Sequence, residues 1–194
     1  MKKIKEILFR PKEFFKNVKK EKGIKKAFVY LLILSLFYYV LSLTNYFLFS
    51  EEQKALITGV FDVSPFALYI ISDVLFYFFG LIMSFVTSYF FYLWLKLFEC
   101  KEPWNVVYKL TVYSNTPLYL IGWIPFIGAI VGWVYSLILM IIGIREVYNV
   151  STKKAALIYL IPIAILIFLL FVFLFVIFFI YYSSLGLEST AGTF

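Results

Sequence analysis

The chain has 194 residues, of which 63% are hydrophobic and 23% aromatic, with a net charge of +7 and a mean hydropathy of +0.94. A soluble domain of this length has too little interior to bury so much apolar surface, so the composition indicates a protein solvated by lipid. The sequence has one cysteine and no histidine, which excludes an intrachain disulfide, Cys/His metal sites, and Ser-His-Asp or Cys-His catalysis.

Residues 1–26 form a basic, amphipathic segment with 11 lysines and arginines. One helical face is apolar and carries Ile4, Ile7, Leu8, Phe14, Phe15 and Val18. Pro11 is predicted to open a second short helix within the segment. This pattern favours an interfacial helix on anionic lipids over a solvated tail. The basic region and the apolar run after it exceed the lengths of a signal peptide, so we expect a retained first span.

Five apolar runs follow, each long enough for a membrane helix, at residues 27–49, 64–98, 106–123, 126–144 and 155–182. They are apolar on all sides and too long for barrel strands. Ser64-Pro65 is expected to begin the second helix as N-cap and first helical residue, and Ser151 or Thr152 to cap the fifth. Only Ile124-Pro125 separates the third run from the fourth, which predicts an antiparallel hairpin.

The sequence therefore predicts an all-α, polytopic integral membrane protein. Its parts are a cytoplasmic basic segment (1–26), a five-span helical bundle (27–182) and a mobile extracytoplasmic tail (183–194). Five crossings place 17 of the 18 lysines and arginines on one side and leave Lys54 alone on the other. The positive-inside rule then puts the N-terminus in the cytoplasm. The basic charge is thus explained by orientation, and no nucleic-acid partner is expected.

Small residues recur at every fourth position on two of the predicted helices. The second helix carries Gly80, Ser84 and Ser88, and the fourth carries Gly128, Gly132 and Ser136. This spacing lets another helix backbone approach closely, which favours helix packing over a ligand site. The packed partner is either this chain or a second copy.

Asn115, Thr116 and Pro117 lie midway along the third run. Pro117 has no N–H and frees the carbonyl of Tyr113. Broken helices of this kind build polar sites in transporters, and they also occur as ordinary kinks whose free groups are satisfied by nearby side chains. The kink is favoured, because transporters have paired breaks and this chain has one.

The remaining polar residues favour structural roles. Asp73, the one acid inside an apolar run, is expected near the outer interface at the start of an overlong helix. Cys100 is juxtamembrane and is expected to be unmodified, with lipidation as the alternative. Arg145 and Glu146 end the fourth helix as cytoplasmic ion-pair candidates. Since neighbouring helix positions do not face each other, each is expected to pair with other groups. No constellation supports an enzyme or a cofactor.

Several of these elements together resemble the Yip1 domain family of five-span membrane proteins. They are the Tyr113–Pro117 element, Pro125 with Gly128 and Gly132, the Gly143–Glu146 exit, Ser151–Ala156, Pro162, and Pro11–Phe15, which is similar to the start of prokaryotic members. The resemblance implies a cytoplasmic N-terminus and an extracytoplasmic C-terminus. Eukaryotic relatives act in Golgi and ER vesicle traffic as heteromeric, non-enzymatic partners of membrane proteins and contact Rab GTPases. This chain lacks their Asp-Leu-Tyr-Gly-Pro element, so a prokaryotic plasma-membrane protein is expected.

The leading functional hypothesis is a non-enzymatic membrane adaptor that binds other membrane proteins, or a second copy of itself, or shapes the bilayer. The runner-up is a small transporter or channel for an ion, solute or lipid. The shortage of partnered polar groups at mid-membrane favours the adaptor.

Overall fold

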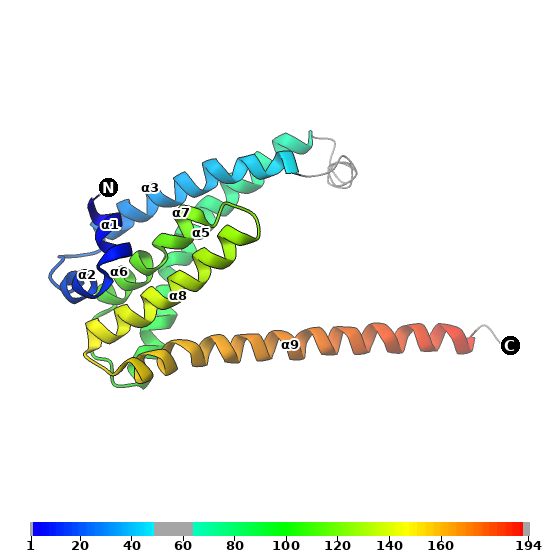
Figure 1. Cartoon of the computed structure of the whole chain (residues 1–194). Coiled ribbons are helices and arrows are strands. Elements are labelled where there is room, and N and C mark those ends of the chain that lie inside the picture. The colour runs from blue at the N-terminus through cyan, green and yellow to red at the C-terminus, as the bar shows by residue number, and fades with distance from the viewer. Residues whose placement is uncertain (1, 49–63, 192–194) are drawn as a thin grey trace. The chain divides into compact units, whose positions relative to one another are not determined.

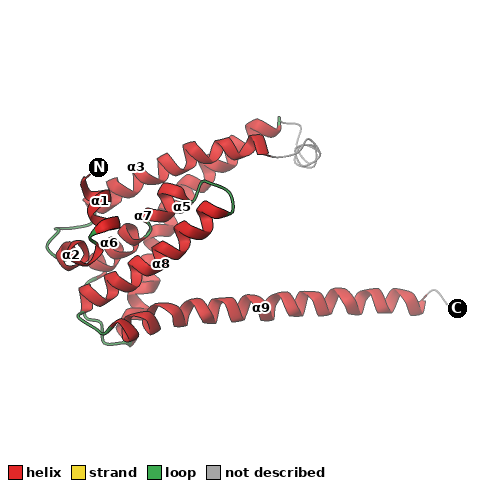
Figure 2. Ribbon diagram, viewed as in Figure 1, coloured by secondary structure: helices red, strands yellow, loops and turns green. Residues whose placement is uncertain are grey.

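The computed structural model describes residues 2–48 and 64–191, with side chains as far as Tyr182. Every regular element in this part of the chain is a helix (Figure 2). The chain divides into two units, Met1–Ala155 and Ala156–Phe194, which are described separately below. The polar residues between the first and second predicted spans, with the end of the first span at residue 49, lie outside the described residues, as does the end of the predicted tail at 192–194.

The N-terminal segment folds as two short helices, α1 (Lys2–Phe9) and α2 (Pro11–Val18). Pro11 occupies the first turn of α2, as predicted, because its missing N–H has no partner to lose there. The apolar side chains Ile7, Phe15 and Val18 are 0%, 0% and 3% exposed. They are therefore covered by protein and not by lipid. The predicted interfacial position of the segment as a whole stays a prediction.

The first two long helices follow. Helix α3 (Lys25–Ser42) continues into a 3₁₀ turn, η1 (Leu43–Leu48). Helix α5 (Pro65–Leu97) has 33 residues, and the hydroxyl of Ser64 accepts a hydrogen bond from the Ala67 N–H at 3.2 Å. The predicted N-cap and proline start of this helix are thus confirmed.

The third apolar run is interrupted at the place where the sequence predicted a kink. It forms α6 (Trp104–Ser114) and α7 (Thr116–Ile121), which are separated at Asn115. The break falls there because Pro117 cannot donate the next helical hydrogen bond. Helix α7 then turns back through residues 122–126 and packs against α8 (Ile127–Tyr148), so the predicted hairpin is present with a shorter first arm (Figure 1).

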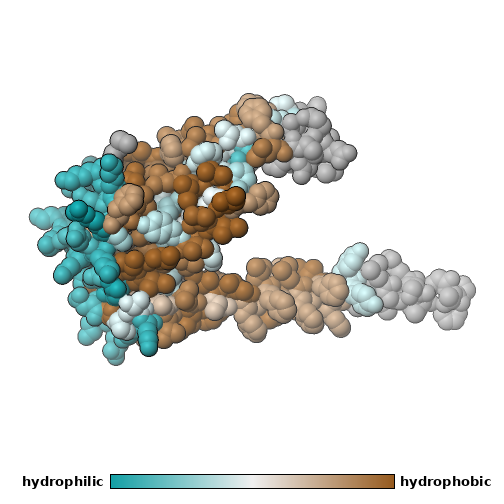
Figure 3. Space-filling model, viewed as in Figure 1, coloured by the Kyte–Doolittle hydropathy of each residue, from teal (hydrophilic) through white to brown (hydrophobic). Residues whose placement is uncertain are grey.

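Helix α6 is the most deeply buried element of the first unit. Eight of its eleven residues are buried, and the largest of these side chains are Tyr108, Lys109 and Tyr113. It packs against α2, α3, α5 and α8. Hydrophilic side chains gather at the end of this unit that carries α1 and α2, while the long helices are covered by apolar ones (Figure 3).

The second unit is the greater part of α9 (Thr152–Ala191). The Ser151 hydroxyl accepts from the Lys154 N–H at 3.2 Å, so Ser151 is the cap. The helix continues past the predicted end at Tyr182 and includes most of the predicted tail. All side chains from Ile165 to Tyr182 are exposed.

Four helical segments of the described chain are long and apolar enough to cross a membrane: Lys25–Leu48, Pro65–Leu97, Ile127–Tyr148 and Thr152–Tyr182. Helices α6 and α7 are each too short to qualify alone. The described part of the chain is thus all-helical and has the apolar helices of a membrane protein, and whether α6 and α7 together make a fifth crossing stays a prediction.

Candidate functional site

A buried lysine joins α6 to the N-terminal segment. Lys109 is 1% exposed, and its ammonium donates to the backbone carbonyl of Val18 at 3.0 Å and to that of Glu21 at 2.5 Å. The last carbonyls of a helix have no partner within it and attract a cation. Lys109 therefore satisfies the end of α2 and fixes the loop that follows it.

The side chain of Glu21 lies at the centre of a second set of contacts. Its carboxylate accepts from Lys3 Nζ at 3.0 Å and from the Tyr113 hydroxyl at 2.8 Å, and Lys3 Nζ also donates to that hydroxyl at 2.6 Å. Burial by itself raises the pKa of Glu21, but the bonds from Lys3 and Tyr113 and the charges of Lys3 and Lys109 outweigh it and lower the pKa from its usual value. Glu21 is ionised at neutral pH. These four residues, Lys3, Glu21, Lys109 and Tyr113, are called the charged cluster.

The break between α6 and α7 follows directly after Tyr113, and its free polar groups form hydrogen bonds within the chain. The Thr116 hydroxyl donates to the carbonyl of Tyr113 at 2.7 Å, which is the group that Pro117 leaves free. The Tyr30 hydroxyl lies 2.9 Å from that of Thr116, and the Asn115 amide donates to the carbonyl of Thr111 at 3.1 Å. The polar groups that the break exposes thus have partners within the chain.

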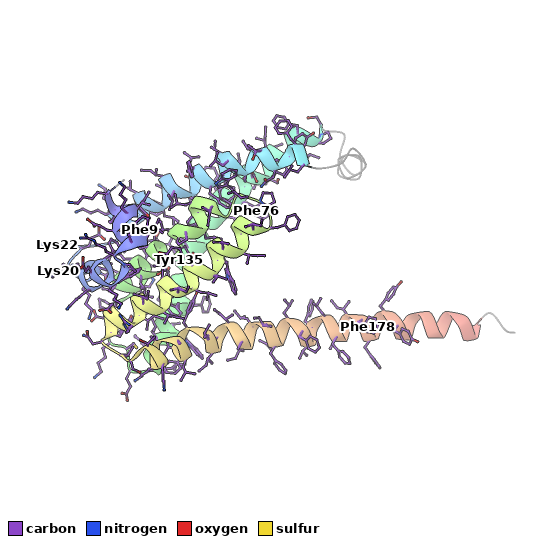
Figure 4. All side chains as sticks on the ribbon, in the orientation of Figure 1. Phe9, Lys20, Lys22, Phe76, Tyr135 and Phe178 are labelled. Atoms are coloured by element: carbon purple, nitrogen blue, oxygen red, sulfur yellow. The ribbon has the colours of Figure 1, made fainter. Side chains whose placement is uncertain are left out.

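Apolar packing holds α1 and α2 in place around these polar contacts. The rings of Phe14 and Tyr30 lie edge-on to Tyr113, with centroids at 5.1 Å and 5.3 Å. Phe15 packs where Gly143 of α8 leaves room. Tyr135 of α8, labelled in Figure 4, donates its hydroxyl to the carbonyl of Leu8.

The N-terminal segment, residues 1–26, forms an open groove of about 500 Å³. Its charged lining alternates in sign: Lys3, Glu6, Arg10, Glu13, Lys20, Glu21 and Lys26. Figure 4 shows Lys20 and Lys22 beside α2, pointing away from the long helices. The groove therefore offers both cations and carboxylates to a ligand or partner of mixed charge.

The small residues of α5 face polar side chains of α6 and α3. The Ser88 hydroxyl is 2.7 Å from that of Thr111, and the Ser84 hydroxyl is 3.4 Å from that of Tyr108. A methyl group added at Gly80 would meet only the Tyr39 hydroxyl, at 3.7 Å.

The small residues of α8 face backbone. A methyl group at Gly128 would lie 2.1 Å from the carbonyl oxygen of Ile121, and one at Gly132 would lie 3.1 Å from Cα of Leu118. Ser136 is 5% exposed, and its hydroxyl has no hydrogen-bond partner in the described residues. The contacts of both sets of small residues thus lie within this chain.

Arg145 and Glu146 pair with each other, contrary to expectation. The guanidinium donates to Glu146 Oε1 from Nε at 3.0 Å and from a terminal nitrogen at 2.5 Å. A second terminal nitrogen donates to the Thr152 hydroxyl at 3.3 Å. Both residues thus form an ion pair, and Arg145 also bonds another group, as expected. The expectation that they would not pair with each other was wrong, because a long arginine side chain can fold back along the helix although the Cβ directions of neighbouring residues diverge.

The remaining candidates have ordinary partners. Asp73 accepts a hydrogen bond from the Ser42 hydroxyl at 2.8 Å. Cys100 is 5% exposed, and burial raises the pKa of its thiol although the charge of Lys154 opposes the change. No group of three or more His, Cys, Asp or Glu residues among the described ones is arranged to hold a metal ion.

The charged cluster was missed at the level of sequence. In the sequence, Lys109 is one of the 17 lysines and arginines on the predicted cytoplasmic side, and Lys3 and Glu21 belong to the basic segment 1–26. A signal was nevertheless present, because Lys109 and Tyr113 are four positions apart and so share one face of a helix within a predicted membrane span. A lysine there requires a partner, although its spacing does not say which one.

The profile of the Yip1 domain family matches residues 5–175, which include Glu21, Lys109 and Tyr113 of the charged cluster and all four membrane-length segments in whole or in part. Comparisons with curated proteins and with solved structures gave no match. The match covers most of the chain and agrees with its apolar helices, and the chain therefore belongs to the Yip1 domain family of membrane proteins.

Proposed function

We propose that this protein is a non-enzymatic membrane adaptor, which uses its N-terminal helices as a fixed binding surface for other membrane proteins or a second copy. The observation that carries the proposal is the buried attachment of α2 through Lys109. A segment that only adhered to lipid would not need a buried cation within the bundle to hold it. The mixed-charge groove beside it supplies the surface.

The proposal includes five crossings with the N-terminus in the cytoplasm. Together α6 and α7 contain 17 residues, which at about 1.5 Å per residue approach the thickness of the hydrocarbon core. If they did not cross, Arg145, Lys153 and Lys154 would lie outside, against the positive-inside rule. The remaining surface lysines of the N-terminal segment then face the anionic inner leaflet of the cell membrane, each contributing about 1 kcal/mol of attraction.

Topology is tested by labelling single cysteines in a Cys100→Ala background in intact cells. A cysteine at Lys153 should be protected from an impermeant reagent, and one at Ser189 should react. Labelling at Lys153 without permeabilisation would exclude five crossings.

The adaptor role is tested by the Lys109→Met variant. The change removes the ammonium that donates to the carbonyls of Val18 and Glu21. Leaving buried acceptors without their donor costs about 1–3 kcal/mol, so α2 should detach before the bundle unfolds. We expect faster trypsin cleavage at Lys19–Lys22 in inverted membrane vesicles and loss of partners cross-linked in native membranes. The control is Lys153→Met, which removes the same charge from an exposed position. Unchanged cleavage and unchanged partners in Lys109→Met would refute the adaptor proposal.

Transport is the second candidate, and one cavity favours it. A pocket of about 150 Å³ between α3, α5, α6 and α7 is lined by polar side chains that include Ser84, Thr87, Thr111, Asn115 and Tyr119. Purified protein in liposomes would be assayed for ion leak and lipid scrambling. Robust activity that disappears in the Asn115→Ala/Pro117→Leu variant, but not in Lys153→Met, would favour transport over the adaptor.

A further inference from the structure

A further pocket lies where α2, α5 and α8 end and α9 begins. It has a volume of about 320 Å³ and lies between the C-terminal ends of α2, α5 and α8 and the first turn of α9. Its lining residues come from these segments and are Lys19, Phe98–Lys101, Glu102, Tyr148–Val150 and Lys154. Since α5, α8 and α9 are membrane-length helices, the pocket lies at a membrane surface whichever side that is.

The two loops of the pocket satisfy their own backbone groups. Glu99 and Asn149 adopt left-handed conformations, with φ of 60° and 53°. These turns allow the Cys100 N–H to bond the carbonyl of Leu95 at 3.2 Å and the Val150 N–H to bond that of Arg145 at 3.3 Å. The carbonyls of Leu95 and Arg145 at the helix ends thus have backbone partners. The charge of the pocket therefore depends mainly on its side chains.

Among those side chains, cations are in excess. Lys19 is paired with Glu102 at 2.5 Å, so these two charges largely cancel. Lys101 and Lys154 are exposed, and neither ammonium has an ion-pair partner within residues 2–48 and 64–182. Glu99 is the one further acid in the lining. The Lys154 charge is close enough to oppose the effect of burial on the pKa of the Cys100 thiol.

Tyr148 adds an unused hydrogen-bonding group. Its hydroxyl is buried, and within the described part of the chain it has no hydrogen-bond partner. Buried hydroxyls almost always have one, so an unpaired phenol in the wall of a cationic pocket indicates a missing acceptor. A phosphate group fits, because it offers several acceptor oxygens and a negative charge to two ammonium groups and one O–H donor.

We propose that this pocket binds a phosphate group, with Lys101 and Lys154 supplying the charge and Tyr148 one hydrogen bond. At the level of the membrane surface the phosphate belongs to the headgroup of an anionic phospholipid or to a small soluble phosphate ester. Basic pockets between membrane helices bind lipid headgroups in this way. The site is separate from the charged cluster and does not depend on the proposed adaptor function.

The test uses the purified full chain in detergent and follows its thermal unfolding during titration with lipid. Phosphatidylglycerol should raise the unfolding temperature, and phosphatidylcholine should not, since a ligand that binds the folded state stabilises it. The Lys101→Gln/Lys154→Gln variant should bind phosphatidylglycerol at least about tenfold more weakly. The control is Lys22→Gln/Lys153→Gln, which removes two exposed charges that do not line the pocket.

Tyr148→Phe separates a specific site from general attraction. It changes no charge and breaks no hydrogen bond within the described chain, so the protein without lipid should keep its unfolding temperature while its affinity for phosphatidylglycerol falls several-fold. Competition by glycerol 3-phosphate or inorganic phosphate at millimolar concentration would identify a soluble ligand, and its absence a lipid. Equal weakening in the Lys22/Lys153 control, or full affinity in Tyr148→Phe, would overturn the proposal.

Discussion

The small-residue ridges of α5 and α8 have the same spacing and different surroundings. On α8, Gly128 and Gly132 lie against the backbone of α7 and the turn after it, with no room for a side chain. On α5, Ser84 and Ser88 lie against hydroxyl groups of α6, and Gly80 has open space beyond it. A repeat of small residues therefore shows where a neighbour approaches closely, but whether that neighbour is backbone or a polar side chain depends on the fold.

The largest difference is expected for leucine at the two central glycines. In Gly132→Leu the new side chain has to displace Cα of Leu118, so we expect a loss of at least about 3 kcal/mol in the free energy of unfolding. Gly80→Leu should lose less than about 1 kcal/mol, because its side chain can enter the neighbouring pocket. Reversible unfolding in mixed detergent micelles measures both. Equal losses would mean that the two ridges do not differ.

Gly128→Ala should cost about 2–3 kcal/mol although it adds a single methyl group. Both nearest atoms, the Ile121 carbonyl oxygen at 2.1 Å and Ile124 Cβ at 2.6 Å, belong to the tight connection between α7 and α8 and cannot retreat without opening it. The same unfolding measurement applies. A variant as stable as the native protein would show that this turn is compliant.

Replacing a serine by alanine should lower stability on the α5 ridge and should not lower it on the α8 ridge. Ser88→Ala removes a contact with Thr111 in a neighbouring helix and should cost about 0.6–1 kcal/mol. Ser136→Ala removes a buried hydroxyl that has no partner in the described chain, and should leave stability unchanged or raise it slightly. A loss at Ser136 as large as that at Ser88 would reveal a partner for its hydroxyl.

A small effect is also expected for Gly80→Ala, and it should be favourable. The added methyl group meets only the Tyr39 hydroxyl at an ordinary distance of 3.7 Å. Alanine favours a helix over glycine by up to about 1 kcal/mol, so a gain of several tenths is expected. Thermal unfolding beside Gly128→Ala compares the two ridges directly. Destabilisation at Gly80 would indicate a close neighbour that one chain does not supply, such as a second copy.

The course of the long helices could be predicted because lipid imposes one simple requirement, a long apolar run. The starts of α5 and α9 could be predicted from local residues, because Ser64 and Ser151 cap a helix N-terminus and Pro65 suits its first turn. The separation of α6 from α7 was harder to place. Pro117 indicated a kink, but whether the chain bends or breaks depends on the partners that Thr116 and Asn115 find around them.

The charged cluster could not be predicted, because it joins residues that are far apart in the sequence. Spacing along a helix brings Lys109 and Tyr113 together, but nothing local connects them to Lys3 or Glu21. The burial of Phe15 and Val18 against protein could not be predicted from the sequence for a related reason. An apolar face beside lysines is equally suited to lipid and to a protein neighbour, and only the packed structure distinguishes them.

The buried Lys109 also has a consequence for biosynthesis. A lysine in the middle of a membrane helix makes insertion less favourable by about 3 kcal/mol, and α6 with 11 residues and α7 with 6 are short for independent insertion. The carbonyl of Val18 that accepts from this lysine lies 91 residues earlier in the sequence, so it leaves the ribosome first. If α6 and α7 cross the membrane together, the group that compensates the charge of Lys109 is already synthesised when they insert. In that case we expect the N-terminal segment to assist the insertion of the segment formed by α6 and α7.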